Sequence, residues 1–108
     1  MTLMSTVTIT KIQDDFYKGV QSIELHRIVE VGEYRYRIII DRDSHDFQSV
    51  AKAEVWTATG WAMVISRPIQ MLRAKAFSYG MRDIGPAYDS FDSDAGVLLD
   101  AARAVIEP

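Results

Sequence analysis

Apolar and polar side chains alternate along residues 20–31 and again along residues 34–41. An alternation with period two is typical of a strand with one buried face, so the pattern predicts two strands. Gly32 and Glu33 separate them and suit a two-residue type II′ turn with glycine at the first central position. The resulting hairpin has one charged residue, Arg27, on its apolar face. Its facing pairs are predicted to be Val31 with Tyr34, Val29 with Tyr36, and Arg27 with Ile38.

A second hairpin is predicted for residues 49–57 and 61–66. If Ala58 and Thr59 form a type I turn and Gly60 follows in the left-handed region, a three-residue loop joins the two strands. A helix could approach this hairpin closely because Ala51 and Ala53 are small. The loop would place three pairs on one apolar face: Thr57 with Trp61, Val55 with Met63, and Ala53 with Ile65.

The remaining patterns predict an edge strand and two helices. Residues 6–10 alternate like an edge strand, and residues 1–5 are expected to fray. Apolar residues spaced by three and four predict a helix that begins after an N-cap at Asp92 or Ser93 and ends at Ile106. Pro68 suits the first turn of a shorter helix ending near Tyr79, and residues 80–91 are predicted to form a loop. The inward stripe of the terminal helix is predicted to comprise Ala95, Leu98, Leu99, Ala102, Val105 and Ile106.

Composition indicates an ordinary single domain. Of 108 residues, 48% are hydrophobic and 25% are charged, which is the balance of a soluble protein with one core. No apolar run has the length of a membrane span and the first ten residues lack the pattern of a signal peptide, so we expect a cytoplasmic protein without membrane contact. The absence of Cys excludes disulfides and thiolate metal sites. A net charge of −3 disfavours general electrostatic capture of nucleic acid.

Acidic clusters are the first candidates for chemistry. Residues 41–46 place oxygen ligands at alternate positions, as calcium loops do. The sixth position holds Asp46 instead of glycine and the twelfth holds Lys52 instead of a carboxylate, which favours a solvated loop. A second cluster, of Asp89, Asp92 and Asp94, is explained by helix capping and the helix dipole.

Catalytic motifs are absent. His26 and His45 are too few for a three-histidine zinc site, and no nucleophile elbow or phosphate-binding glycine pattern occurs. We therefore predict no catalytic residues, no metal and no cofactor. Abundant carboxylates leave an enzyme open as the third alternative.

The reverse face of the predicted sheet mixes cations with flat apolar side chains. Trp and Arg are enriched at the centres of protein interfaces, so this face is predicted to bind a protein partner or a second copy. The same mixture suits nucleic acid, although Glu24, Glu30, Asp41 and Glu54 on this face oppose phosphate. It is also possible to explain this face without a partner, if the N-terminal segment or the helix after Pro68 covers it. Lys52, Arg67, Ile28 and Val50 also belong to it, and the predicted partner-binding residues are Arg35, Arg37, Trp56, Ile39 and Val64.

Two stretches carry resemblances. A meander followed by residues 94–106 resembles the end of a double-stranded-RNA-binding domain, whose last helix carries Ala at similar spacing. The family's RNA-binding lysine cluster is replaced here by Asp92, Ser93 and Asp94. Residues 53–61 and 66–68 are similar to small proteins of unknown function from actinobacteria and their phages. This resemblance implies a source for the chain but does not imply any particular activity. An excess of Arg over Lys, eight to four, is typical of GC-rich bacterial and phage genomes.

Together these patterns predict one α+β domain over residues 1–108. It comprises a four- or five-stranded antiparallel β-meander with a C-terminal helix packed on one face, and a second short helix. The favoured function is that of a small phage-encoded interaction or accessory protein that binds a protein partner or itself. A nucleic-acid-binding module using Arg35, Arg37 and Trp56 is the alternative.

Overall fold

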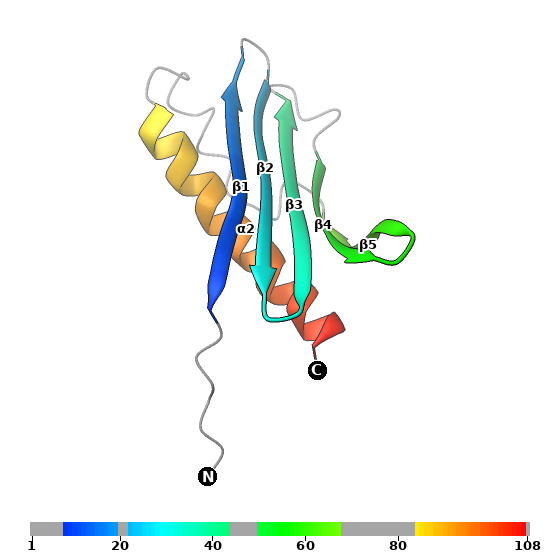
Figure 1. The fold of residues 1–108 in the computed structure, drawn as a ribbon. Helices are drawn as coiled ribbons and strands as arrows, with labels where there is room; N and C mark the ends of the chain where they lie inside the picture. The colour runs from blue at the N-terminus through cyan, green and yellow to red at the C-terminus, as the bar shows by residue number, and fades with distance from the viewer. Residues whose placement is uncertain (1–7, 20–21, 44–49, 68–83, 108) are drawn as a thin grey trace.

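The computed structural model describes residues 8–19, 22–43, 50–67 and 84–107. They form a five-stranded antiparallel sheet in the order β1-β2-β3-β4-β5, with one helix, α2, on one of its faces (Figure 1). The predicted α+β class and the antiparallel meander are confirmed. The helix predicted for residues 68–79 lies outside the described residues. The elements are β1 Ile9–Lys18, β2 Ser22–Val31, β3 Tyr34–Asp43, β4 Val50–Thr57, β5 Gly60–Arg67 and α2 Ile84–Ile106.

The first hairpin has the predicted register. Val31 faces Tyr34, and the pairing continues without interruption until Ser22 faces Asp43. Gly32, the first residue of the turn, has a φ of 60°, which a residue without a Cβ adopts readily. β2 and β3, of ten residues each, thus pair along their whole length.

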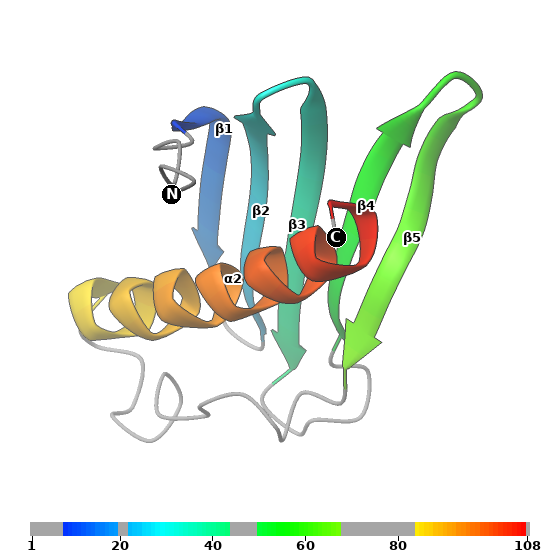
Figure 2. The same ribbon diagram turned by 90° about the horizontal axis from the view of Figure 1, so that it is seen from below.

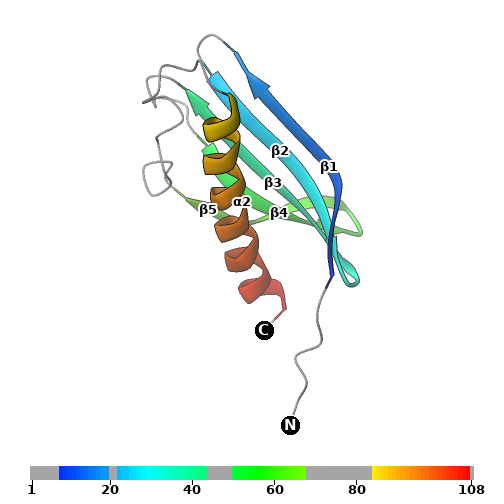
Figure 3. The same cartoon turned by 90° about the vertical axis from the view of Figure 1, so that its left-hand side faces the viewer.

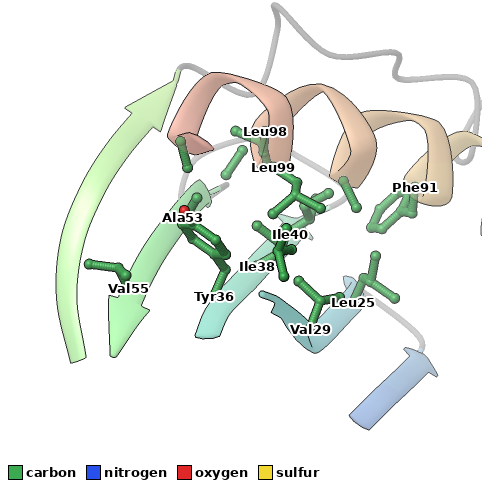
Figure 4. Close-up of a cluster of buried hydrophobic side chains, with 14 of the residues drawn as sticks. Leu25, Val29, Tyr36, Ile38, Ile40, Ala53, Val55, Phe91, Leu98 and Leu99 are labelled. Atoms are coloured by element: carbon green, nitrogen blue, oxygen red, sulfur yellow. The ribbon is translucent and has the colours of Figure 1, made fainter. Parts of the chain in front are cut away.

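The core lies between the sheet and α2, which runs obliquely across the strands from beside β1 to β4 (Figure 2). Apolar side chains from β2, β3 and β4 point toward the helix and meet its inward stripe (Figure 4). Fully burying one such aliphatic side chain contributes about 1.5–3 kcal/mol. The buried cluster comprises Ile23, Leu25, Val29, Val31, Tyr36, Ile38, Ile40, Ala51, Ala53, Val55, Phe91, Ala95, Leu98, Leu99 and Ala102.

The second hairpin differs from the prediction. Its loop has two residues, Ala58 and Thr59, so that Thr57 faces Gly60. The side chain of Thr57 closes this turn, because its Oγ1 accepts a hydrogen bond from Thr59 N at 3.2 Å and donates one to Gly60 O at 2.7 Å. The predicted three-residue loop is therefore wrong, although Gly60 has a positive φ of 122°.

The shorter loop changes which residues of β5 face the core. Trp56 faces Trp61 and Glu54 faces Met63, so the predicted pairs Thr57 with Trp61 and Val55 with Met63 are wrong. The predicted pair of Ala53 with Ile65 is correct because a β-bulge between Ala53 and Glu54 shifts the register. The additional residue that was predicted for the loop thus lies within β5, at the bulge. As a result, Trp61 and Met63 lie on the face opposite α2.

Helix α2 begins at Ile84, well before the predicted cap at Asp92 or Ser93. The predicted loop is therefore wrong for residues 84–91. Proline is tolerated in a first helical turn because the N–H groups there have no intrahelical acceptor, so Pro86 does not prevent the helix. Asp94 is buried within the helix instead of lying in its first turn, and Val105 is exposed instead of facing the core.

The N-terminal strand is an edge strand, as predicted, but it spans Ile9–Lys18 instead of residues 6–10. A register shift between Lys11 and Gln13 interrupts the alternation of β1. The polar residues after this bulge therefore concealed the strand in the sequence. Beyond the bulge, Asp14 faces Arg27 and Phe16 faces Leu25 on the side of the helix.

Candidate protein-interaction face

Helix α2 covers only one face of the sheet, and no other described element lies over the opposite face (Figure 3). We call this opposite side the uncovered face. Strand register assigns its residues, since side chains that face each other across antiparallel strands point to the same side. They are Thr10, Gln13, Asp15, Tyr17, Ser22, Glu24, His26, Ile28, Glu30, Arg35, Arg37, Ile39, Asp41, Val50, Lys52, Glu54, Trp56, Trp61, Met63 and Ser66.

Two tryptophans form an apolar patch on this face near the tip of the β4–β5 hairpin. The ring centroids of Trp56 and Trp61 are 5.2 Å apart, with the ring planes inclined by 67°. The guanidinium carbon of Arg37 lies 4.7 Å from the Trp61 ring centroid, a cation–π arrangement. Trp56 stays 52% exposed. The ring of Trp56 therefore offers a flat aromatic surface to a partner. Its neighbour, Trp61, is already held in place.

Carboxylates accompany the basic side chains of the uncovered face. Arg37 Nε donates to Glu54 Oε1 at 2.6 Å, and Lys52 Nζ lies 3.9 Å from Glu54 Oε2. Arg35 Nη2 lies 2.6 Å from Glu30 Oε2. Each of the three permanent cations assigned to this face in the described residues thus has a carboxylate partner.

The face also carries more acidic than basic groups. His26 Nε2 lies 3.1 Å from Glu24 Oε1, and Asp15 and Asp41 add two further carboxylates. Exposed ion pairs of this kind contribute only about 0–1 kcal/mol to stability, so their main effect is to neutralise the surface. A surface without excess positive charge attracts phosphate weakly.

The structure brings together four of the five predicted partner-binding residues. Arg35, Arg37, Ile39 and Trp56 lie on the uncovered face. Val64 does not join them, because it lies at the β-bulge and packs against the core.

Trp61 and Met63 lie on this face although the sequence pattern did not predict them there, whereas Arg67, which was predicted there, faces Ala51 on the helix side. The signal that could have revealed the turn is Thr57, because a threonine hydroxyl can close a short loop by bonding to the backbone two residues on.

A cluster of side chains around the buried Arg27, on the helix side, accounts for the charged residue on the apolar face of β2. Arg27 Nε and Nη2 donate to Asp14 at 2.8 and 3.1 Å, and Nη1 lies 2.8 Å from Asp92 Oδ1. Arg27 Nη2 also donates to the hydroxyl of Tyr88, which in turn donates to Asp14 Oδ2 at 2.6 Å. We call these four residues the arginine clamp.

The clamp is a structural element. Burial acts to raise the pKa of Asp14, but hydrogen bonds from Arg27 and Tyr88 outweigh it and lower the pKa below its usual value. All three guanidinium nitrogens of Arg27 have partners in the clamp, which thereby joins β1, β2 and α2.

Within the described ranges, no group of three or more His, Asp or Glu side chains is placed to hold a metal ion. Of the acidic segment 41–46, only residues 41–43 are described, and they belong to β3. His45 lies outside the described residues. Among the helices described, none is long and apolar enough to cross a membrane. Comparisons with protein-family models, curated proteins and solved structures found no match, so the geometry of the uncovered face carries the functional argument.

Proposed function

We propose that this protein is an interaction module that binds a protein partner through the uncovered face, centred on Trp56. The observation that carries the proposal is the exposure of Trp56 and Met63, 52% and 64%, beside cations that already have carboxylate partners. Adjacent exposed apolar side chains are a mark of interaction sites, and Trp is strongly enriched among the residues that dominate binding energy.

The local packing supports a preformed binding surface. Trp56 rests edge-on against Trp61, which in turn lies under Arg37. Side chains already held by neighbours lose little conformational freedom on binding, and this lowers the entropic cost of association. Truncating such an aromatic anchor typically costs 2 kcal/mol or more, which is about a 30-fold loss in affinity.

Nucleic acid is the less favoured partner for this face. Phosphate binding needs cations that are free to replace condensed counterions, and its affinity falls steeply as salt rises. Here Arg35, Arg37 and Lys52 are paired with Glu30 and Glu54. Binding a phosphate would require breaking these pairs beside the remaining carboxylates.

Site-specific photo-cross-linking in the source cell tests the proposal. A photoreactive amino acid at position 56 is expected to give a discrete protein adduct. The matched control replaces Val97, which is 49% exposed on α2, on the other side of the molecule. A nucleic-acid adduct at position 56, or the same adducts at both positions, would contradict the proposal.

A further inference from the structure

The two edges of the sheet differ in how they are protected against pairing with another strand. β1 carries Lys11, Asp14 and Asp15 together with a β-bulge, and the arginine clamp fastens it to α2. Charged residues and bulges are the features by which natural edge strands avoid further pairing. β5, at the other edge, also contains a bulge, at Val64, but it has no charged residue before Arg67.

The apolar part of β5 is also accessible. Met63 is 64% exposed and Ala62 is exposed, and in the described part of the chain no strand pairs with the outer edge of β5. We propose that β5 pairs antiparallel with β5 of a second copy, which joins two five-stranded sheets into one sheet of ten strands. A second copy fits because an uncharged strand meets its own equivalent without like-charge repulsion, and twofold dimers are the commonest protein assemblies.

The β-bulge indicates where the two strands meet. Trp61 and Met63 point to the uncovered face, and Ala62, between them, points to the other side. A twofold axis at Ala62 places Trp61 opposite the partner's Met63, and Met63 opposite the partner's Trp61. Side chains on the same face are thus matched across the seam, and each exposed Met63 gains an aromatic neighbour. Ala62 meets the partner's Ala62 at the axis, where its small side chain allows close approach.

This dimer would extend the uncovered face. A twofold axis that relates two antiparallel strands of one sheet runs perpendicular to the sheet, so both copies of α2 lie on the same side. The two uncovered faces then form one continuous surface, with a Trp56–Trp61 pair on each side of the seam. The inference goes beyond the proposed function, because it concerns the edge of β5, whereas partner binding is centred on Trp56 of β4.

Substitutions that place like or opposite charges at the twofold axis test the proposal. Sedimentation equilibrium of the full chain is expected to show a dimer. Ala62→Glu and Ala62→Lys each place two like charges opposite one another, and either variant alone should weaken dimerisation by about tenfold or more. An equimolar mixture of the two variants should restore a dimer that contains one copy of each. Restoration would also show that both variants fold.

Two controls separate this inference from the proposed function. Ile12→Lys adds a charge at a half-exposed position of the opposite edge and should leave the dimer intact. Trp56→Ala should also leave the dimer intact while weakening partner binding. A wild-type chain that stays monomeric at all concentrations, or Ala62 variants that dimerise as well as wild type, would overturn the inference without affecting the proposed function.

Discussion

Trp56 faces Trp61 across the β4–β5 hairpin on the side of the sheet opposite α2, with their ring centroids 5.2 Å apart. Their positions follow from the two-residue turn at Ala58 and Thr59, since a loop one residue longer would turn Trp61 toward the core. The hydrogen bonds of Thr57 in this turn therefore influence the composition of the uncovered face.

The two tryptophans are expected to differ in their contributions to stability. Trp61 lies under Arg37 and beside Trp56, whereas half of the Trp56 surface faces solvent. We predict that Trp61→Ala lowers the free energy of unfolding by about 1–3 kcal/mol and Trp56→Ala by less than about 1 kcal/mol. Urea denaturation of both variants measures the difference. A larger loss for Trp56→Ala would mean that Trp56 supports the fold instead of serving as an exposed anchor.

The C-terminal helix is expected to be indispensable for the core. Leu98 is 0% exposed between the helix and the sheet, and Leu98→Ala should lower the free energy of unfolding by about 2–5 kcal/mol. Val105, on the same helix, is 60% exposed, so Val105→Ala should change it by no more than about 0.5 kcal/mol. Equal melting temperatures for the two variants would show that α2 does not pack on the sheet.

Substitutions at glycines can distinguish the cost of a strained backbone from the cost of crowding by an added side chain. A Cβ at Gly60, Gly32 or Gly96 would meet no atom within 4 Å, but only Gly60 and Gly32 have positive φ, 122° and 60°. Gly60→Ala should therefore destabilise by about 1–2 kcal/mol. Gly96→Ala, within α2, should stabilise by about 0.4–1 kcal/mol. Thermal unfolding measures both shifts, and stabilisation by Gly60→Ala would contradict the assigned turn geometry.

The arginine clamp predicts a specific dependence of stability on pH. Hydrogen bonds from Arg27 and Tyr88 lower the pKa of Asp14 below its ordinary value of 3.8. A carboxyl whose pKa is lowered by folding stabilises the fold fully above its unfolded-state pKa, and this contribution is lost as pH falls through the folded-state pKa. Wild type should therefore lose stability in acid below about pH 4.

Asp14→Asn tests this origin of the acid sensitivity. The variant should be less stable than wild type at neutral pH, and it should lose less stability on acidification, because position 14 no longer takes up a proton. Denaturant titrations across the acidic range measure both quantities. Parallel curves for variant and wild type would show that Asp14 does not contribute to the pH dependence.

Much of the fold was predictable from local sequence signals. The β2–β3 hairpin has a clean alternation and a turn glycine, and its predicted register is correct at all three pairs that involve Tyr34, Tyr36 and Ile38. The β4–β5 hairpin was only partly predictable, because a glycine after a short turn fits more than one loop length. The bulge within β5 has no strong sequence signature, so the face of Trp61 required the structure.

The start of α2 and the extent of β1 depend on long-range contacts. Phe91 and Tyr88 pack against β1 through Phe16, and these contacts favour a helix across a segment whose Gly85 and Pro86 indicate a loop. Arg27 interrupts the apolar pattern of β2 because its partners are distant in sequence, at Asp14 and Asp92. Tertiary packing of this kind overrides local propensity.

The most direct test of the proposed function is the affinity of the partner identified by cross-linking, measured by calorimetry for wild type and Trp56→Ala at low and high salt. We expect Trp56→Ala to weaken binding about 30-fold at both salt concentrations, because the lost contact is apolar and aromatic. Wild-type affinity should change little with salt. Unchanged affinity for Trp56→Ala, together with a steep loss of wild-type binding at high salt, would contradict the account and indicate an electrostatic interface instead.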